Sequence, residues 1–218
     1  MLPFNQNLQG ERFFCRYERE TQVAMPGYYS VKLADMNIDV ELTVTERTAM
    51  HKYTFNQPGE ANLLLDLQNG LVFNSKNIRY RVLEGEVEML DNKTIAGYNR
   101  VRGWVARYFY YMIVFDRPYT VKKELPQEEG EKAKRFILEF DLKEGESVQV
   151  KVALSTVGIE GAKMALDKEN PGWNFESIKA ETNGKWNDML SLVEVEGTEE
   201  EKMNFYTSMY HLFIQPTN

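Results

Sequence analysis

The stretch over residues 26–55 constrains the fold of this chain more than any other. Apolar residues alternate with polar ones over 29–33 and again over 38–44. Side chains on a strand point to opposite faces with a period of two residues, so each run has one apolar face and one polar face. Asp35 and Asn37 lie between the runs and supply turn chemistry. The pattern predicts an antiparallel hairpin, which needs a second apolar layer to be stable in water.

More strands are expected along the following hundred or so residues. A third strand is predicted over 51–55, directly after the hairpin, and the short apolar run over 62–67 is typical of a strand buried on both faces. A long aromatic strand is predicted over 104–115. Many short strands with few helices between them favour an antiparallel sandwich over parallel βαβ units, up to residue 155.

The second layer is expected to come from the later strands. The alternating runs 136–142 and 148–154 are separated by a short connection that contains Gly145, and we interpret them as a second hairpin. Together with the strand over 104–115, this hairpin is predicted to cover the first one. The charged segment 122–135 has little apolar content and is predicted to be a solvated loop.

After Ser155 the apolar period changes to that of helices. Asn174 is placed to cap one helix, and Thr198 with Glu201 forms a capping box that opens another. The apolar positions of the three expected helices are, in order, Ile159, Ala162 and Leu166; Phe175, Ile178, Trp186, Met189 and Val193; and Met203, Tyr206, Tyr210 and Phe213. The last helix has aromatic groups on more than one side. We therefore expect a helical domain to cover it, with self-association through this helix as an alternative.

Composition and motifs exclude several classes of function. The 33 acidic residues outnumber the 26 basic ones, and the formal charge of −7 argues against binding to nucleic acid. The sequence contains no apolar run long enough to span a bilayer. With Cys15 as its single cysteine, the chain cannot form an internal disulfide. Motif searches find no phosphate-binding loop, dinucleotide fingerprint, zinc-protease helix or nucleophile elbow.

Trp104 and His211 are the candidate substrate-binding residues. Trp104 starts the aromatic strand, where it can stack on a sugar or pack in the core. His211 lies beside Tyr210 near the end of the last helix, where it can bind, pack or place a cation near the helix dipole. His51 shares a strand face with aromatic residues, and we interpret it as structural. The residues give no grounds for assigning a catalytic, cofactor-binding or metal-ligating position.

Segments along nearly the whole chain, from residue 16 to residue 218, resemble glycoside hydrolase family 92, the calcium-dependent exo-acting α-mannosidases. In chain order these segments are PGYYSVKL, IDVELTVTERTAMHKYTF, EANLLLDLQNGL, IAGYNRVRGWVARYFYYMIVFDRPY, KVALSTVGIEGAKMALDKENPGWNF and WNDMLSLVEVEGTEEEKMNFYTSMYHLFIQPTN. Their consistent order is what makes the resemblance specific.

The resemblance implies a mainly β fold with C-terminal helices. Residues 1–155 would form a twisted antiparallel β-sandwich of the galactose-mutarotase-like supersandwich kind, lacking its N-terminal part. Residues 156–197 would form linker helices. Residues 198–218 would start a truncated helical catalytic domain, contributing the first helix of an (α/α)6 barrel.

The resemblance also implies a function for the parent enzyme. That enzyme would be an inverting exo-α-mannosidase that acts on mannose-containing glycans with calcium, and it would be a periplasmic or secreted bacterial protein. Its catalytic acid and base would lie outside this chain, in the missing helical catalytic domain, so the chain alone is expected to be inactive. The alternative is a non-catalytic carbohydrate-binding or interaction sandwich.

Overall fold

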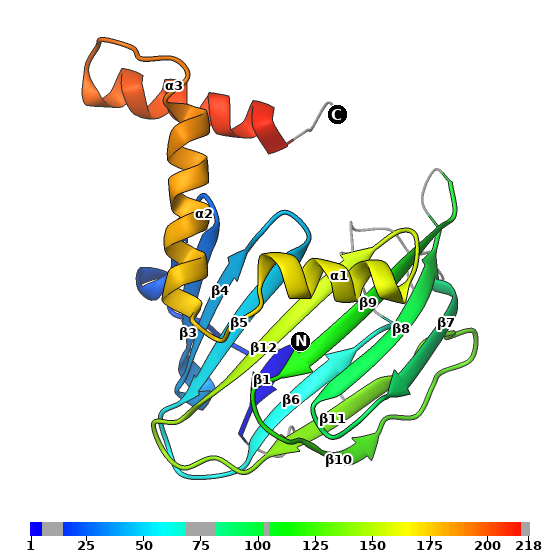
Figure 1. The fold of residues 1–218 in the computed structure, drawn as a ribbon. Helices are drawn as coiled ribbons and strands as arrows, with labels where there is room; N and C mark the ends of the chain where they lie inside the picture. The colour runs from blue at the N-terminus through cyan, green and yellow to red at the C-terminus, as the bar shows by residue number, and fades with distance from the viewer. Residues whose placement is uncertain (6–14, 69–81, 103–104, 215–218) are drawn as a thin grey trace.

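The computed structural model describes residues 1–5, 15–68, 82–102 and 105–214. Within these residues two antiparallel sheets face each other, and three helices follow them (Figure 1). The smaller sheet contains, in spatial order, β1 (Leu2–Phe4), β6 (Ala61–Asp66), β11 (Arg135–Phe140) and β10 (Thr120–Glu124). The larger sheet contains β2 (Val23–Met25), β3 (Tyr28–Leu33), β4 (Ile38–Val44), β5 (Thr48–Phe55), β12 (Ser147–Ser155), β9 (Arg107–Phe115), β8 (Thr94–Val101) and β7 (Val82–Met89). This arrangement confirms the predicted antiparallel sandwich.

The hairpin predicted at the start of the sandwich is also confirmed. Strands β3 and β4 pair antiparallel with Val31 opposite Val40, and β5 continues the sheet. A short 3₁₀ turn, Ala34–Met36, joins β3 to β4 and ends at Asn37. Asn37 has a left-handed φ of 48°, and its side-chain amide donates to the carbonyl oxygen of Asn56 at 3.1 Å. Asparagine tolerates this conformation better than most residues. The predicted role of Asn37 in the turn is therefore confirmed.

The predicted second hairpin is wrong. Strand β11 pairs with β6 and β10 in the smaller sheet, whereas β12 pairs with β5 and β9 in the larger one. The connection between β11 and β12 is therefore an arch from one sheet to the other. It crosses over Phe55, whose carbonyl oxygen accepts a hydrogen bond from the Gly145 amide at 2.7 Å. A two-residue period shows that each strand has an apolar face, but it does not show which strand lies beside it.

The source of the second layer agrees with the prediction only for β11. Strands β9 and β12 lie in the same sheet as the first hairpin, so the layer that covers it comes from β6 and β11. All residues from Ala61 to Leu65 are buried, as predicted for a strand buried on both faces. The two sheets meet at Phe115 of β9 and Phe140 of β11, whose ring centroids are 5.3 Å apart. Apolar burial between the sheets is the main force that holds the sandwich together.

The segment 122–135 is mostly an exposed loop, as predicted, but two of its residues are buried. It begins with the end of β10, and its two apolar residues Leu125 and Ala133 are buried, with exposures of 6% and 2%. The Leu125 amide donates to the carbonyl oxygen of Arg135, and the amides of Lys132 and Ala133 donate to Oε1 of Gln68. These bonds satisfy backbone groups that would otherwise need water. Two isolated apolar residues in a charged stretch are too few for a periodic signal.

Two helices, α1 (Ile159–Glu169) and α2 (Phe175–Leu190), pack on the outer face of the larger sheet, and α3 (Glu199–Ile214) crosses the far end of α2 (Figure 1). The predicted caps are confirmed, because Oδ1 of Asn174 accepts from the Ser177 amide at 3.0 Å, and Thr198 and Glu201 bond reciprocally. The apolar face predicted for α2 is buried only at its start. Met189 remains 43% exposed, and Val193 lies beyond the end of the helix.

The helices dock through small residues and through aromatic contacts. Ala162, Ala165 and Leu166 of α1 pack against Ala96, Met112 and Ala153 of the sheet. The indole of Trp186 in α2 meets the ring of Tyr210 in α3, with ring centroids 4.8 Å apart. None of the helices that the structure describes has both the length and the apolar character that a bilayer span requires.

His51 lies half-buried on the core-facing side of β5, and its Nδ1 is 2.8 Å from the hydroxyl oxygen of Tyr53. Burial lowers the pKa of His51 to about 4, because a partly dry environment disfavours the charged imidazolium. This placement suits the structural role expected from the sequence.

We expect His51 to make the fold less stable in acid. The unfolded chain binds more protons than the folded one between pH 6.5 and about 4, so the free energy of unfolding should fall as the pH falls through this range. The loss should be on the order of 2 kcal/mol, because the ring is only partly shielded. Urea titrations of His51→Gln at several pH values should show a flatter profile. The exposed His211 provides the control, and a His211→Gln profile as flat as that of His51→Gln would contradict the assignment.

Candidate functional site

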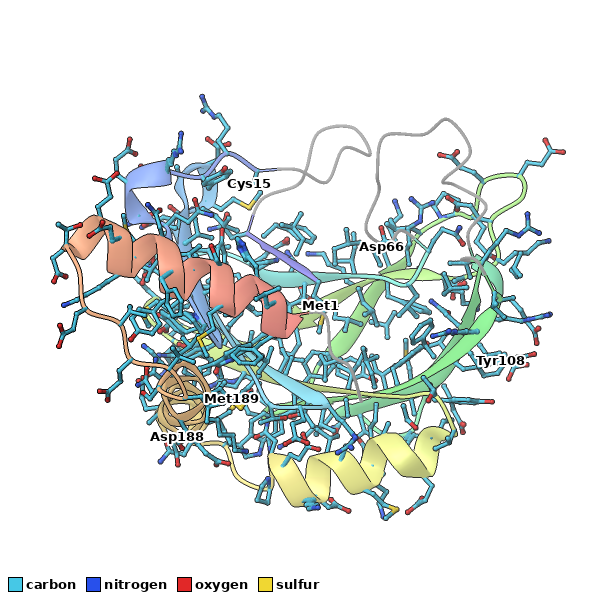
Figure 2. All side chains as sticks on the ribbon, turned by 90° about the horizontal axis from the view of Figure 1, so that it is seen from above. Met1, Cys15, Asp66, Tyr108, Asp188 and Met189 are labelled. Carbon is cyan, nitrogen blue, oxygen red and sulfur yellow. The ribbon has the colours of Figure 1, made fainter. Side chains whose placement is uncertain are left out.

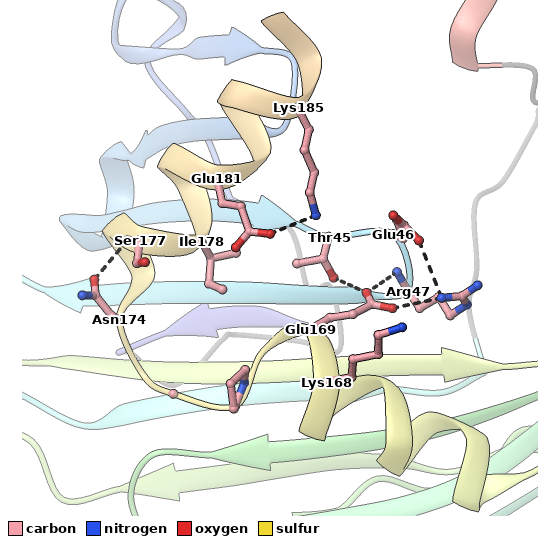
Figure 3. A pocket seen from close by; sticks show the side chains of 12 residues that line it. Thr45, Glu46, Arg47, Lys168, Glu169, Asn174, Ser177, Ile178, Glu181 and Lys185 are labelled. Carbon is pink, nitrogen blue, oxygen red and sulfur yellow. Dashed lines mark hydrogen bonds and ion pairs between the residues drawn. The ribbon is translucent and has the colours of Figure 1, made fainter. Parts of the chain in front are cut away.

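A polar pocket lies where the sandwich meets the first two helices (Figure 3). It has a volume of about 460 Å³ and is formed by the turn between β4 and β5, the end of α1 and the start of α2. The lining residues are Thr45, Glu46, Arg47, Lys168, Glu169, Pro171, Gly172, Asn174, Ser177, Ile178, Glu181 and Lys185. Three of these side chains are carboxylates and three are basic, so the pocket is polar and mixed in charge.

Glu169 is the centre of this pocket. Its carboxylate accepts hydrogen bonds from the hydroxyl of Thr45 at 2.7 Å, from the amide of Arg47 at 2.9 Å and from the guanidinium of Arg47 at 3.1 Å. The Glu169 side chain is only 13% exposed. Burial alone would raise the pKa of Glu169, but the bonds from Thr45 and Arg47 outweigh it and hold the pKa below its ordinary value. The carboxylate is therefore ionised at neutral pH and joins α1 to the β4–β5 turn.

Replacement of Glu169 by glutamine should lower the free energy of unfolding by about 1–3 kcal/mol, because a neutral amide cannot accept all three bonds. In the wild-type protein the same contribution should be lost as the pH falls below 4.5 and through the lowered pKa of Glu169. The matched control is Glu181→Gln. Glu181 also lines the pocket, but it pairs with Lys185 at a site where both side chains are 57% exposed, so its loss should cost under about 0.5 kcal/mol. Equal losses in the two variants, measured by urea denaturation, would refute this role of Glu169.

A buried lysine fixes the connection between α1 and α2 beside the pocket. Nζ of Lys151 donates to the carbonyl oxygen of Asn170 at 2.7 Å and lies 4.3 Å from the ring centroid of Trp173. Burial lowers the pKa of Lys151, and the nearby Asp167 opposes this shift. A cation above an indole face is a favourable contact. Lys151 therefore holds the Asn170–Trp173 connection against the sheet, and Trp173 has a structural role here.

Within the parts of the chain that the structure describes, no three or more His, Cys, Asp or Glu side chains are grouped so that they could hold a metal ion. A calcium site built from three or more such side chains is therefore not present among the described residues. In the pocket, the half-buried, ionised carboxylate of Glu169 is bonded to Thr45 and Arg47, so it is not available as a proton donor to a substrate.

Of the two predicted substrate-binding residues, the structure describes only His211. Trp104 lies outside the described residues. His211 is exposed on α3, with its ring centroid 5.9 Å from that of Tyr210, and it is not among the residues that line the pocket in Figure 3. The pocket itself was missed from the sequence, because Arg47 and Glu169 are 122 positions apart and neither belongs to a motif.

Two family models match consecutive parts of the chain. Residues 2–155 match the glycosyl hydrolase family 92 N-terminal domain, and residues 161–218 match the glycosyl hydrolase family 92 catalytic domain. The chain belongs to glycoside hydrolase family 92. No curated protein matches it.

Solved structures of family 92 share the fold. A family GH92 α-mannosidase from Bacteroides thetaiotaomicron superposes with a TM-score of 0.80 at 26% identity, over 96% of this chain and 31% of the enzyme. The same enzyme in complex with mannoimidazole gives 0.79 at 25% identity, over 96% and 30% of the two chains. A family GH92 inverting mannosidase from the same organism gives 0.79 at 21% identity, over 96% and 29%, and this likeness shows the fold alone. The chain thus spans about a third of the length of these enzymes.

The two family matches meet close to the pocket. The sandwich lies in the part that matches the N-terminal domain, and nearly all of α1, with α2 and α3, lies in the part that matches the catalytic domain. The pocket in Figure 3 lies between these two parts, so Glu169 and Lys151 join the N-terminal domain to the start of the catalytic domain.

Proposed function

We propose that this chain belongs to an inverting exo-α-mannosidase that removes mannose from mannose-containing glycans. The observation that carries the proposal is the match to the N-terminal domain and the catalytic domain of family 92 in consecutive residues of one chain. The superposition on a family GH92 α-mannosidase over 96% of the chain supports it. The complex of that enzyme with mannoimidazole supports a glycan as the substrate.

The proposal assigns a part to each region of the chain. Residues 1–155 form the sandwich, 156–197 form the linker helices, and 198–218 begin the helical catalytic domain. That domain supplies the catalytic acid and base and the calcium site, and it covers the exposed apolar groups of α2 and α3. These groups include Met189 of α2 and Met203 and Leu212 of α3, the last being 75% exposed. We further propose a periplasmic or secreted bacterial enzyme.

In this proposal His211 and Trp104 are substrate-binding residues. His211 belongs to α3, within the segment that matches the catalytic domain. Replacement of His211 by alanine in an enzyme that contains the catalytic domain would raise KM for an α-mannoside if the side chain contacts the sugar.

The test is hydrolysis of an aryl α-mannoside with and without calcium. We expect no turnover by this chain alone, because the proposal places the catalytic acid, the base and the calcium site in the rest of the catalytic domain. We expect turnover by a version that is extended to include the family 92 catalytic domain, with loss of activity in a chelator and release of β-mannose, the inverted product, detected by NMR. Turnover by the chain alone after stringent purification would contradict the proposal that the catalytic acid and base lie outside it. Release of α-mannose by the extended version would show that the enzyme retains the anomeric configuration, and would contradict the proposed inverting mechanism.

The alternative function is a non-catalytic carbohydrate-binding sandwich. The observation that favours it is a group of half-exposed tyrosines on the outer face of the larger sheet.

A further inference from the structure

Three tyrosines gather on the outer face of β8 and β9. Tyr98 lies directly opposite Tyr110 in the sheet, and Arg100 lies directly opposite Tyr108. The ring centroids are 5.6 Å apart for Tyr98 and Tyr108, 5.7 Å for Tyr98 and Tyr110, and 6.0 Å for Tyr108 and Tyr110. Tyr108 is 37% exposed, and the other two are partly exposed. Figure 2 places Tyr108 at the outer surface of the larger sheet, away from α1.

Helix α1 leaves this group of residues uncovered. The helix packs on the next row of the same face, where Ala96, Met112 and Ala153 are buried against it. The sheet therefore changes along β8 and β9 from small buried residues under the helix to large aromatic residues open to water. Aromatic groups that remain exposed together on one face mark a binding surface more often than scattered ones do.

Charged side chains of β7 and β8 lie beside the tyrosines. Glu86 pairs with Tyr98 across β7 and β8, and Glu84 pairs with Arg100. The Tyr98 hydroxyl donates to Oε1 of Glu84 at 2.8 Å, and the guanidinium of Arg100 lies 5.6 Å from the centroid of the Tyr108 ring. Both carboxylates are exposed. The surface thus combines aromatic faces with hydrogen-bond acceptors and a planar donor, all supplied by rigid strands.

This combination matches the chemistry of a neutral sugar. A pyranose ring has apolar C–H faces that can lie on an aromatic ring, and hydroxyl groups around its edge that both donate and accept hydrogen bonds. Sites of this kind use apolar contact for affinity and a few placed polar groups for orientation. Two carboxylates against one guanidinium leave the surface slightly negative, as is the whole chain with its charge of −7, so a polyanion would be repelled.

We propose that the surface formed by Glu84, Glu86, Tyr98, Arg100, Tyr108 and Tyr110 binds a neutral oligosaccharide. The proposal deepens the carbohydrate function proposed above and rests on it. In this arrangement the sugars lie along the exposed parts of the three rings, with their hydroxyls toward Arg100, Glu84 and Glu86. A purely structural role of the tyrosines, as cross-strand packing, would give the sheet stability but no affinity for sugar.

The test is an NMR titration of this chain with mannotriose at millimolar concentrations. We expect amide shifts that saturate and that cluster on β7, β8 and β9. Tyr108→Ala should weaken binding by about tenfold or more, which corresponds to about 1.4 kcal/mol. Tyr108→Phe keeps the ring and should stay within about twofold of the wild type. Tyr17→Ala is the matched control, because Tyr17 is 55% exposed and lies on a different part of the chain, and it should bind as the wild type does.

Several results would overturn the proposal: no shifts on mannotriose addition, shifts that cluster elsewhere, or equal binding by the wild type and Tyr108→Ala. If Tyr108→Ala does not fold, Arg100→Gln tests the same surface with all three rings in place, and unchanged binding by this variant would contradict the proposal.

The mannosidase activity proposed above and sugar binding at this surface can be disproved independently. Sugar binding here without hydrolysis by the extended enzyme would contradict the mannosidase proposal alone, and hydrolysis without binding here would contradict this surface alone.

Discussion

Replacement of Phe115 by alanine is expected to lower the free energy of unfolding by about 3–5 kcal/mol. Phe115 is 1% exposed, and its ring centroid lies 5.3 Å from that of Tyr119 and 5.3 Å from that of Phe140. The ring thus joins the two sheets through β9 and β11. The alanine variant would lose the apolar burial of the ring and would leave a cavity that the two sheets cannot both close. Most small domains have a total stability of only about 5–15 kcal/mol, so the variant should be near its unfolding threshold.

The same strand provides the control for Phe115. Phe109 is also on β9 but is 37% exposed near the end of the sandwich, so Phe109→Ala should cost about 1 kcal/mol. Urea denaturation followed by tryptophan fluorescence measures both variants. Similar losses for the two would show that the contact between the sheets does not depend on Phe115, and would contradict the packing described for the core.

What the sequence predicts well in this fold is local. The β3–β4 hairpin depends on alternation within a few residues and on Asn37, whose side chain suits the left-handed turn. The caps at Asn174 and Thr198 depend on groups three residues away. Each of these features is decided by neighbours in the sequence, so the pattern and the structure agree.

What the sequence does not predict is which strand lies beside which. The runs that became β11 and β12 have the alternation and the Gly145 turn of a hairpin, yet the chain crosses between the sheets there. A hairpin and an arch place the same apolar residues in the same core, and the choice between them depends on β6 and β5, which are distant in the sequence. Pairing between distant strands has no local signal.

The same limit applies to the candidate sites. Alternation places Tyr108 and Tyr110 on one face of β9, but only the register of β8 brings Tyr98 and Arg100 to them. The pocket of Glu169 and Arg47 depends on the docking of α1 against the β4–β5 turn. His211 and Trp104 were chosen as residue types that suit sugar binding, and both remain predictions, the latter because it lies outside the described residues.

Gly97 is the position where a single added methyl group should do the most damage to the larger sheet. It lies in β8 between Val87 of β7 and Tyr111 of β9. A Cβ at this position would collide with the backbone carbonyl oxygen of Glu86 and would come within 2.6 Å of the Tyr111 hydroxyl. That hydroxyl donates to the same oxygen of Glu86 at 3.0 Å. The absence of a side chain at Gly97 therefore leaves room for the Tyr111 hydroxyl to bond to the Glu86 carbonyl of β7, the edge strand.

Gly97→Ala should lower the free energy of unfolding by about 3 kcal/mol, because backbone cannot move aside as a flexible side chain can. Displacement of β7 should also expose its amides, so hydrogen exchange in β7 and β8 should speed up more than in β3 and β4. Gly172→Ala is the control: a Cβ there meets nothing within 4 Å, and the change should be neutral or stabilising by up to about 1 kcal/mol. Equal stability of the two variants would mean that β7 can shift without cost. Glu84 and Glu86 would then not be held in fixed positions beside Tyr98, and the surface proposed for sugar binding would lose its rigid border.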